Sequence, residues 1–243
     1  MTRASELGGA IIAAGAGSRF QQAGWTVPKP LVPVAGVPLI EHAIRHFLAA
    51  GITSLVVILN EQGRECVGWV RRRFPDLDLQ FIVKTTRSSY ESFREVLRRA
   101  DRERTLVSTV DAWCPDGDFV RFVEAAPQYP PGAAVLAVTP FVADDRPLWV
   151  SLDASGRVVR LGGDSGDLVT AGFYLVPGRL GRLTPPPAVT RLRDFLAWLV
   201  ERREPLYGVV LPAVVDVDRT EDVALAEALF HRATPDTRRE GNR

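Results

Sequence analysis

The sequence predicts an α/β protein with a Rossmann-like, doubly wound sheet, mixed but mainly parallel, and a small β-hairpin lid region. Two observations predict this fold class. Between residues 10 and 138, apolar runs typical of buried strands alternate with segments whose apolar residues recur at helical spacing. After residue 148 the segments are short and joined by tight turns, of which Asp-Ala-Ser-Gly at 153–156 is typical of a β-hairpin. The first pattern predicts parallel strands with crossover helices, and the second adds antiparallel strands.

The individual elements follow from local patterns. Residues 10–14 are a small, fully apolar run that ends at Gly15, as expected of a buried strand entering a loop. Residues 38–50 carry apolar side chains at helical spacing, and Gly51 supplies the C-terminal stop. The same criteria predict strands at 55–59, 79–83, 105–110, 133–138, 149–152, 158–161, 169–176, 206–211 and 213–217. They predict further helices at 61–74, 89–100, 117–126, 191–201 and 220–231.

The whole fold is expected in one domain, residues 1–233. A chain of 243 residues can form one large α/β domain, and no internal repeat, low-complexity stretch or linker divides this one. The last residues, 234–243, are rich in Arg, Asp, Thr and Pro, and we expect them to be a disordered C-terminal tail.

Composition limits the partners of the protein. A formal net charge of +1 argues against nucleic acid or an anionic membrane as a partner, since both usually require a basic surface. The apolar run at 10–14 is too short for a membrane span, and residues 1–9 lack the start of a signal peptide. Two cysteines, Cys66 and Cys114, provide neither a disulfide framework nor a zinc site. We therefore expect a cytoplasmic protein that acts on small molecules as a monomer or homodimer.

Lysine is rare in this chain. Of 30 basic residues only Lys29 and Lys84 are lysines, and all the others are arginine. A lysine ammonium is a compact, strongly hydrated point charge that a planar guanidinium does not replace. Both lysines are therefore candidate functional residues, with chance retention as the alternative for each.

A glycine-rich loop follows the first predicted strand. Residues 13–19 are Ala-Ala-Gly-Ala-Gly-Ser-Arg, and glycines allow successive backbone N–H groups to converge on phosphate oxygens. The loop lacks the third glycine of a dinucleotide-binding loop, since position 20 is Phe20, and it lacks the Gly-Lys-Ser/Thr of a Walker loop. Two glycines alone are equally compatible with an ordinary turn. The continuation favours phosphate binding, because residues 27–31 are Val-Pro-Lys-Pro-Leu and residues 36–40 are Gly-Val-Pro-Leu-Ile.

Residues 12–40 closely resemble the signature of the nucleotide-diphospho-sugar pyrophosphorylases, the GT-A-like nucleotidyltransferases. That signature runs Leu-Ala-Ala-Gly-x-Gly-x-Arg, then Pro-Lys-Pro-Leu, then Gly-x-Pro-Leu-Ile, with the spacing found here. The branch that this segment resembles most activates sugar 1-phosphates. The resemblance implies that Arg19 steadies the leaving pyrophosphate and that Lys29 stabilises charge at the α-phosphate. It also implies a loop that binds the nucleotide through Ala13, Ala14, Gly15, Ala16, Gly17 and Ser18.

Three aspartates are candidate Mg²⁺ ligands. Asp111 closes the predicted strand 105–110, where the family resemblance implies the first metal ligand, and Mg²⁺ binds one or two carboxylates together with phosphate oxygens. Residues 215–222 are Val-Asp-Val-Asp-Arg-Thr-Glu-Asp and resemble the family's late Asp-x-Gly/Asp-Thr-x-Glu-Asp pattern, which implies a further ligand at Asp216. Asp218 lies two residues on, where a strand would direct it to the same face. For Asp218, metal binding and a role without metal are equally open.

The acceptor pocket is less clear from the sequence. Residues 170–174, Thr-Ala-Gly-Phe-Tyr, resemble the family's Asn-x-Gly-Ile-Tyr segment, which implies that the backbone of Gly172 lies against the acceptor. Ser89 belongs to a serine-rich helix start that is nearer to the Asn-Ser-Leu-x-Ser-Leu segment of cytidylyltransferases acting on phosphocholine and inositol phosphate. Lys84 is expected to bind the nucleotide and Trp113 to bind the substrate, with a surface lysine and a core aromatic as the alternatives.

Together these features predict a Mg²⁺-dependent nucleotidyltransferase that moves an NMP group from a nucleoside triphosphate to a sugar 1-phosphate, giving an NDP-sugar and pyrophosphate. The alternatives are a cytidylyltransferase acting on phosphocholine or inositol phosphate, and a non-catalytic nucleotide-sugar sensor. An acceptor phosphate, with its second pKa of about 6, is already a nucleophile at pH 7, so no general base is required. We accordingly expect His42 and His46 on the surface and Asp144 and Asp145 in a solvated loop.

Overall fold

The computed structural model describes residues 7–233, so the predicted tail at 234–243 lies outside the described residues. The larger strands are β1 (Gly8–Ala13), β4 (Ser54–Leu59), β5 (Asp78–Val83), β6 (Arg104–Thr109), β8 (Ala134–Thr139), β9 (Trp149–Leu152), β10 (Val158–Leu161), β11 (Leu168–Pro177) and β12 (Leu206–Val210). Two-residue strands are β2 (Pro33–Val34), β3 (Val37–Pro38), β7 (Ala112–Trp113) and β13 (Val215–Asp216). The α-helices are α1 (Ser18–Gln22), α2 (Leu39–Ala49), α3 (Glu65–Arg73), α4 (Ser89–Ala100), α5 (Asp116–Ala125), α6 (Leu192–Glu201) and α7 (Thr220–Ala233).

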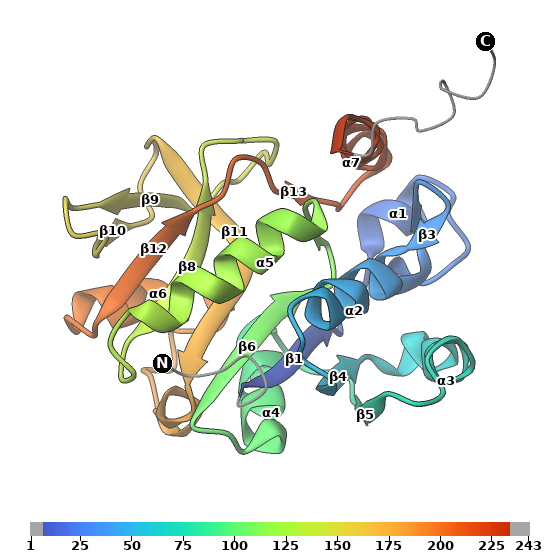
Figure 1. Cartoon of the computed structure of the whole chain (residues 1–243), viewed down its shortest axis with the longest axis horizontal. Helices are drawn as coiled ribbons and strands as arrows, with labels where there is room; N and C mark the ends of the chain where they lie inside the picture. The colour runs from blue at the N-terminus through green and yellow to red at the C-terminus, as the bar shows by residue number, and fades with distance from the viewer. Residues whose placement is uncertain (1–6, 234–243) are drawn as a thin grey trace, which may run out of the picture.

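One mixed sheet of nine strands runs through the protein (Figure 1). Its parallel part has the order β6-β1-β4-β5. The long strand β11 lies antiparallel beside β6 and also pairs with β8 and β9, and β8 pairs in parallel with β12. The α/β fold class expected from the sequence, with a mixed sheet and flanking helices, is confirmed.

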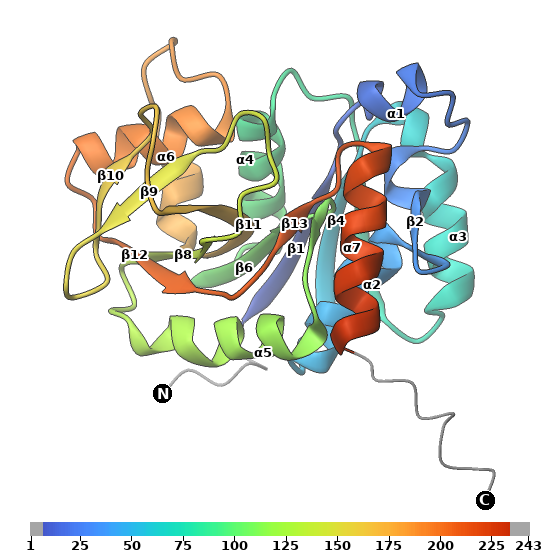
Figure 2. The same ribbon diagram turned by 90° about the horizontal axis from the view of Figure 1, so that it is seen from above.

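Helices cover both faces of this sheet (Figure 2). Buried side chains of α2, α3, α5 and α7 share one hydrophobic cluster, and those of α4 and α6 share another. Strand residues alternate between the two clusters, as Ile11 and Ile12 of β1 do, because successive side chains point to opposite faces. Both faces of β1 are therefore buried, which explains its uninterrupted apolar sequence. Within 7–233, no helix is long and apolar enough to cross a membrane.

The observed elements match the predicted ones closely, with informative differences. The predicted helix 61–74 is divided into a 3₁₀ turn at Glu61–Gly63 and helix α3. Asn60 caps the turn, since its Oδ1 accepts a hydrogen bond from the N–H of Gly63 (2.7 Å). The structure also contains a short hairpin formed by β2 and β3, which was not predicted from the sequence. Its turn residues, Ala35 and Gly36, have φ values of +50° and +75°, the left-handed geometry of a two-residue hairpin turn.

The β9–β10 hairpin forms where the sequence predicts it. Oδ1 of Asp153 accepts hydrogen bonds from the N–H groups of Ser155 (2.8 Å) and Arg157 (3.0 Å), and Gly156 takes φ +78°. The hairpin continues the main sheet beside β11. The segment at 141–148 just before β9, and not the hairpin itself, lines the cavity described below.

Chain segments far apart in the sequence meet at the carboxyl edge of the parallel strands, where ligands bind in open α/β sheets. The loop after β1 and Asp111 after β6 both lie there, as the sequence predicts. The small β7–β13 pair adds a third segment, because Asp216 of β13 lies opposite Ala112 of β7. Asp216 is thereby placed next to Asp111, even though the two residues lie in opposite halves of the chain.

Candidate active site

The glycine loop between β1 and α1 is packed against protein at one glycine and open at the other. Gly17 takes φ +62°, and a Cβ there would lie 2.8 Å from Cβ of Lys29, so only glycine fits. A Cβ at Gly15 would meet nothing within 4 Å, because Gly15 faces a cavity. Ser18 is exposed at the first position of α1.

Asn60 holds this loop in place. Its side-chain Nδ2 donates to the carbonyl oxygen of Gly15 (3.0 Å) and, more weakly, to that of Ala14 (3.4 Å). Its Oδ1 accepts from the N–H of Gly63, so the side chain is fixed at both ends. Sequence reasoning missed Asn60. The available signal was its position directly after strand β4, at the same edge of the sheet as Gly15 and Asp111.

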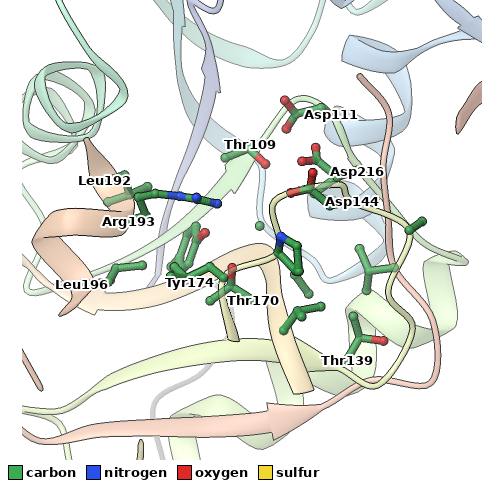
Figure 3. Close-up of a pocket in the computed structure, with 18 of the residues that line it drawn as sticks. Thr109, Asp111, Thr139, Asp144, Thr170, Tyr174, Leu192, Arg193, Leu196 and Asp216 are labelled. Atoms are coloured by element: carbon green, nitrogen blue, oxygen red, sulfur yellow. The ribbon is translucent and has the colours of Figure 1, made fainter. Parts of the chain in front are cut away.

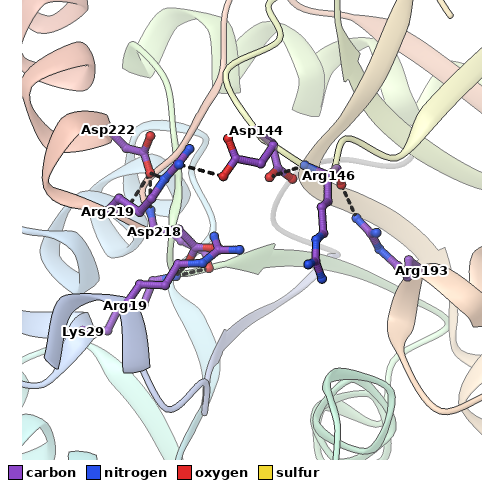
Figure 4. Close-up of polar contacts among 10 residues, drawn as sticks. Arg19, Lys29, Asp144, Arg146, Arg193, Asp218, Arg219 and Asp222 are labelled. Carbon is purple, nitrogen blue, oxygen red and sulfur yellow. Dashed lines mark hydrogen bonds and ion pairs between the residues drawn. The ribbon is translucent and has the colours of Figure 1, made fainter. Parts of the chain in front are cut away.

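Lys29 lies at the centre of an acidic cluster (Figure 4). It is 8% exposed, and its Nζ donates to Oδ2 of Asp111 at 2.6 Å and to Oδ1 of Asp218. Nη1 of Arg19 donates to the other oxygen of Asp218 at 2.8 Å. The residues predicted to be catalytic and those predicted to bind metal are therefore brought together in one cluster.

The charges in this cluster depend on one another. Burial alone would lower the pKa of Lys29, but the carboxylates of Asp111, Asp218 and Asp216 raise it above its usual value, so the amine stays charged. Burial would raise the pKa of Asp111, but the charge of Lys29 outweighs it and the net shift is downward. Asp216 forms no ion pair among the described residues, and desolvation at the cavity, followed by the charge of Asp111, raises its pKa above the usual value against the opposing charge of Lys29.

The carboxylates of Asp111, Asp216 and Asp218 fit a divalent cation. One oxygen from each lies within 4.8 Å of the others, and this is the one such group in the part of the chain that the structure describes. The donors are all carboxylate oxygens, which suit Mg²⁺ better than softer metals. A cation would also relieve the repulsion between the neighbouring carboxylates of Asp111 and Asp216.

A cavity of about 400 Å³ opens on the glycine loop. Its lining includes four predicted nucleotide-binding residues, Ala13, Ala14, Gly15 and Ala16. On the other side it is bounded by the segment from Thr85 to Ser89, and Lys29 and Asp111 lie between the two walls. Gly17 and Ser18 are not among the residues that line it.

Lys84, which the sequence analysis assigned to the nucleotide, points elsewhere. It is exposed, and its Nζ forms ion pairs with Glu91 and Glu95 of α4, both at 2.9 Å. It does not line the nucleotide-side cavity, although its neighbour Thr85 does. The prediction for Lys84 is therefore wrong, and the surface lysine is the better description.

A second cavity of about 250 Å³ adjoins the first and shares Ser89, Thr109 and Asp111 with it (Figure 3). Gly172 lines it with φ +74°, and a Cβ there would come within 2.5 Å of Cβ of Ala112 and 2.7 Å of Oγ1 of Thr109. This position therefore requires glycine. The predicted acceptor residues Ser89 and Gly172 both face this cavity, together with Asp216.

Trp113 does not reach either cavity. Its side chain is 2% exposed and packs edge-on against His42 with ring centroids 6.0 Å apart. The predicted substrate contact is therefore wrong, because Trp113 is a core aromatic. His42 and His46 are also buried, contrary to expectation, and their Nε2 atoms bond to the carbonyl oxygens of Val34 (3.0 Å) and Cys114 (2.8 Å).

Sequence reasoning missed three polar residues of the second cavity: Asp144, Tyr174 and Arg193. Asp144 was expected in a solvated loop but faces Asp216, whose pKa its charge helps to raise. Tyr174 is 6% exposed, and burial, followed by the charges of Asp216 and Asp111, raises its pKa. Arg193 reaches the cavity from α6, where no sequence pattern distinguished it from the many other arginines.

Comparison with known proteins identifies the family. Residues 9–171, more than half of the chain, match the MobA-like NTP transferase domain family. The chain belongs to this family. The nucleotidyltransferase resemblance of residues 12–40 is thereby confirmed.

Two curated proteins are similar to most of this chain. Over 221 residues the chain is 30% identical to a CMP-5'-(3-aminopropyl)phosphonate synthase of Streptomyces rubellomurinus, covering 86% of this chain and 30% of that protein. Over 251 residues it is 28% identical to a bifunctional IPC transferase and DIPP synthase of Rubrobacter xylanophilus, covering 92% of this chain and 52% of that protein. The chain thus spans between about a third and a half of the length of these curated relatives.

The fold is also shared with solved structures. The inositol-1-phosphate CTP transferase from T. maritima superposes with a TM-score of 0.80 over 93% of this chain and 97% of that one, at 16% identity. At this identity the likeness shows the fold alone.

Proposed function

We propose that this protein transfers a nucleotidyl group from a nucleoside triphosphate to the phosphate or phosphonate oxygen of a small acceptor, with release of pyrophosphate. One observation carries the proposal: Asp111, held by Lys29, lies where the cavity of the glycine loop meets the second cavity. A reaction between two bound phosphate compounds needs a junction of this kind, because the reacting atoms must be held about 3–3.5 Å apart.

In the proposed reaction an acceptor oxygen attacks the α-phosphorus, and the bond between the α-phosphorus and the bridging oxygen to the β-phosphate breaks. The acceptor is already an anion near pH 7, so a general base is not needed. Catalysis then depends on positioning and charge stabilisation, which Lys29 supplies at the α-phosphate and Arg19 at the leaving pyrophosphate. Both side chains are paired with Asp218, and the triphosphate would compete with that carboxylate for them.

Mg²⁺ is the proposed cofactor, with Asp111 and Asp216 as its ligands and Asp218 beside them. Bound there, the ion would offset the negative charge of the donor and acceptor phosphates. The loop at 13–18 is proposed to hold the triphosphate through its backbone N–H groups. The open space at Gly15 supports this role, because phosphate oxygens can approach the backbone there.

Two acceptor classes are supported by different observations. A cytidylyl transfer to a phosphonate or an alcohol phosphate is supported by the relatives that align over most of this chain, whose names describe such products. Transfer to a sugar 1-phosphate is supported by the signature at residues 12–40. We place the cytidylyl transfer first, since Ser89, in the segment that resembles such enzymes, lines both cavities.

Pyrophosphate release over a grid of nucleoside triphosphates and acceptors tests the proposal. The grid combines ATP, CTP, GTP and UTP with 2-aminoethylphosphonate, phosphocholine, inositol 1-phosphate and glucose 1-phosphate, with and without Mg²⁺. We expect acceptor-dependent release with CTP and loss of release when Mg²⁺ is chelated. No release from any pair, together with tight binding of an intact nucleotide-sugar, would instead support the sensor.

A further inference from the structure

The second cavity contains several acidic groups and one basic group. Among the described residues that line it, Asp111, Asp144 and Asp216 are acidic, and Arg193 is the only basic one. An acceptor phosphate or phosphonate adds further negative charge to this space. Coulomb repulsion therefore opposes its entry unless a cation lies close to it. Apart from a metal ion, Arg193 is the group in this cavity that can supply that attraction.

Arg193 is held by a well-fixed helix end. It lies in the first turn of α6, and the N–H of the preceding residue, Leu192, donates to Oγ of Ser89 at 3.0 Å. Leu192 and Leu196 are buried in the hydrophobic cluster of that face of the sheet. The start of α6 is therefore anchored both by packing and by a residue that lines the two cavities.

Most N–H donors of the Arg193 guanidinium form no hydrogen bond with the described residues. Its Nη2 donates to the carbonyl oxygen of Arg146 at 2.8 Å, which uses one of five N–H groups. No carboxylate of residues 7–233 forms an ion pair with it. Two other arginines nearby form ion pairs, Arg219 with Asp145 at 2.7 Å and Arg19 with Asp218 at 2.8 Å. Arg146 forms none among the described residues, but it does not line the cavity. Arg193 is thus the one arginine of the described chain that lines this cavity, and no carboxylate there neutralises its charge.

The direction of the side chain agrees with this assignment. Figure 3 shows Arg193 reaching into the cavity from α6 on one side, with Asp111 and Asp216 on the opposite side. An anionic group that enters between them would meet Arg193 on one flank and the proposed metal ligands on the other. A guanidinium binds the oxygens of such a group in a two-pronged geometry that no other side chain offers.

The remaining wall indicates what the anionic group is attached to. Leu148, Val169, Leu196 and Val214 form an apolar part of the lining. Thr139, also in the lining, has its hydroxyl occupied by the carbonyl oxygen of Pro212 and the N–H of Phe141. A volume of about 250 Å³ lies below the roughly 300–1,000 Å³ of most ligand pockets. Thr170 and Tyr174 add hydroxyl groups to the same wall. The wall therefore suits a short alkyl substituent, with or without one polar group.

We propose that Arg193 binds the phosphate or phosphonate group of the acceptor, opposite Asp111 and Asp216, and that the acceptor is a short-chain alkyl phosphonate or alkyl phosphate. This inference rests on the proposed function and names the substrate class of the same site.

Kinetics of Arg193 variants provide the first test. In Arg193→Gln the KM for 2-aminoethylphosphonate should rise about 10- to 100-fold, because a charge-assisted contact is lost, while the KM for CTP stays within about twofold. Arg193→Lys should show a smaller rise, since the charge remains but the fork is lost. Arg202→Gln is the matched control, because Arg202 lies at the other end of α6 and stacks on Trp198. An unchanged acceptor KM in Arg193→Gln would overturn the assignment.

A binding measurement separates this inference from the proposed function. Methylphosphonate is titrated against the wild-type protein and Arg193→Gln in the presence of Mg²⁺, without nucleotide, and followed by ³¹P NMR. We expect its Kd to rise at least about 10-fold in the variant. Equal binding to both proteins overturns the role of Arg193, even if nucleotidyl transfer is found. Arginine-dependent binding without transfer to any acceptor supports the site and overturns the proposed function. Turnover of glucose 1-phosphate but of no alkyl phosphonate or phosphate overturns the substrate class.

Discussion

The nucleotide side and the acceptor side of the site are built in different ways. The nucleotide side is formed by loops at the ends of neighbouring parallel strands, all within the first 111 residues. The acceptor side combines segments from β8, β11, α6 and β13, which lie far apart in the sequence. On β11 the pairing with β8 is interrupted between Thr170 and Tyr174, and Gly172 lies in that irregular stretch. The nucleotide side is thus formed by a compact sequence motif, whereas the acceptor side is assembled by tertiary packing.

This difference suggests how one chemistry can serve several acceptors. The nucleotide side depends on backbone geometry, with Gly17 against Lys29 and Asn60 on the loop carbonyls, and it tolerates little change. On the acceptor side the lining comes mostly from side chains such as Asp144 and Arg193, which can be exchanged without altering the sheet. The following predictions test this contrast, from the largest expected effect to the smallest.

The largest effect is expected on the nucleotide side, at Lys29. Lys29→Ala should lower kcat about 100- to 1,000-fold, on the order of 3–4 kcal/mol in transition-state stabilisation, as for other lost charge-stabilising donors. The only other lysine, Lys84, is exposed and paired with Glu91 and Glu95, so Lys84→Ala is a matched control that should stay within about twofold. Steady-state pyrophosphate release measures both. Near-normal turnover of Lys29→Ala would contradict the assigned role.

The buried packing of helix α2 against α5 and β11, away from both cavities, should make the protein sensitive to acid. His46 of α2 stacks on Phe119 and lies edge-on to Phe173 of β11. Burial lowers its pKa to about 4, despite the carboxylate of Asp116 and the carbonyl of Cys114, which raise it. Between this pKa and the usual histidine value of about 6.5, the side chain is protonated in the unfolded chain but not in the folded protein, so acid favours unfolding. The free energy of unfolding should therefore fall by up to about 3 kcal/mol as the pH drops from about 6.5 to about 4. Burial also lowers the pKa of His42, which adds to the loss in the same direction.

Urea unfolding of the wild type and His46→Phe at several pH values measures the histidine contribution. The variant should lose less stability over this pH range than the wild type. His231→Gln, which removes an exposed histidine of α7, is the control and should keep the wild-type dependence. An equal loss in His46→Phe would mean that other groups cause the acid sensitivity.

A moderate effect is expected at Gly172 on the acceptor side. A Cβ at Gly172 would come within 2.5 Å of Ala112, so Gly172→Ala should destabilise the protein by on the order of 2 kcal/mol and raise the acceptor KM. Gly51→Ala separates crowding from backbone strain, because Gly51 has nearly the same φ, +76°, but nothing within 4 Å of its Cβ position. Thermal unfolding compares the two variants. Equal losses would show that backbone strain, and not the fit against Ala112, requires glycine at Gly172.

The smallest effect is expected at Asn60, which positions the glycine loop without contacting the reacting atoms. Asn60→Ala leaves the Gly15 carbonyl and the Gly63 N–H without their partner, at a cost of about 1–2 kcal/mol. The KM for the nucleotide should rise about 10-fold and the acceptor KM should change little, because the loop borders only the nucleotide side. Gln80→Ala on β5 is an exposed control. A change in both KM values would show that the two sides are coupled through the sheet.

The sequence predicted the nucleotide side far better than the acceptor side. The loop at 13–19, Lys29 and Asp111 are identifiable because they occur at fixed spacing around strand ends, and the structure brings them together. Asp144 and Arg193 reach the acceptor cavity only through the packing of loops and helices, which no local pattern encodes. The errors at Trp113 and Lys84 have a simpler cause. Each adjoins a lining residue, Ala112 and Thr85, and adjacent side chains in extended segments point in opposite directions.

The buried histidines show a second limit of sequence reasoning. His42 and His46 lie on the buried face of α2, but a polar residue type suggested solvent. Their partners are the backbone carbonyls of Val34 and Cys114, which any residue type could supply. A sequence therefore cannot reveal such bonds, although helical spacing does place His42 beside Leu39 and His46 beside Ala43 of the core.

The fate of an acceptor oxygen tests the central claim most directly. An alkyl phosphonate labelled with ¹⁸O in its phosphonyl group is incubated with CTP, Mg²⁺ and the protein, and the product is followed by ³¹P NMR. The account predicts release of one pyrophosphate per product, with ¹⁸O in the bridge between the phosphonate and the α-phosphorus. Release of CDP or inorganic phosphate, or pyrophosphate release that does not depend on the acceptor, would contradict it.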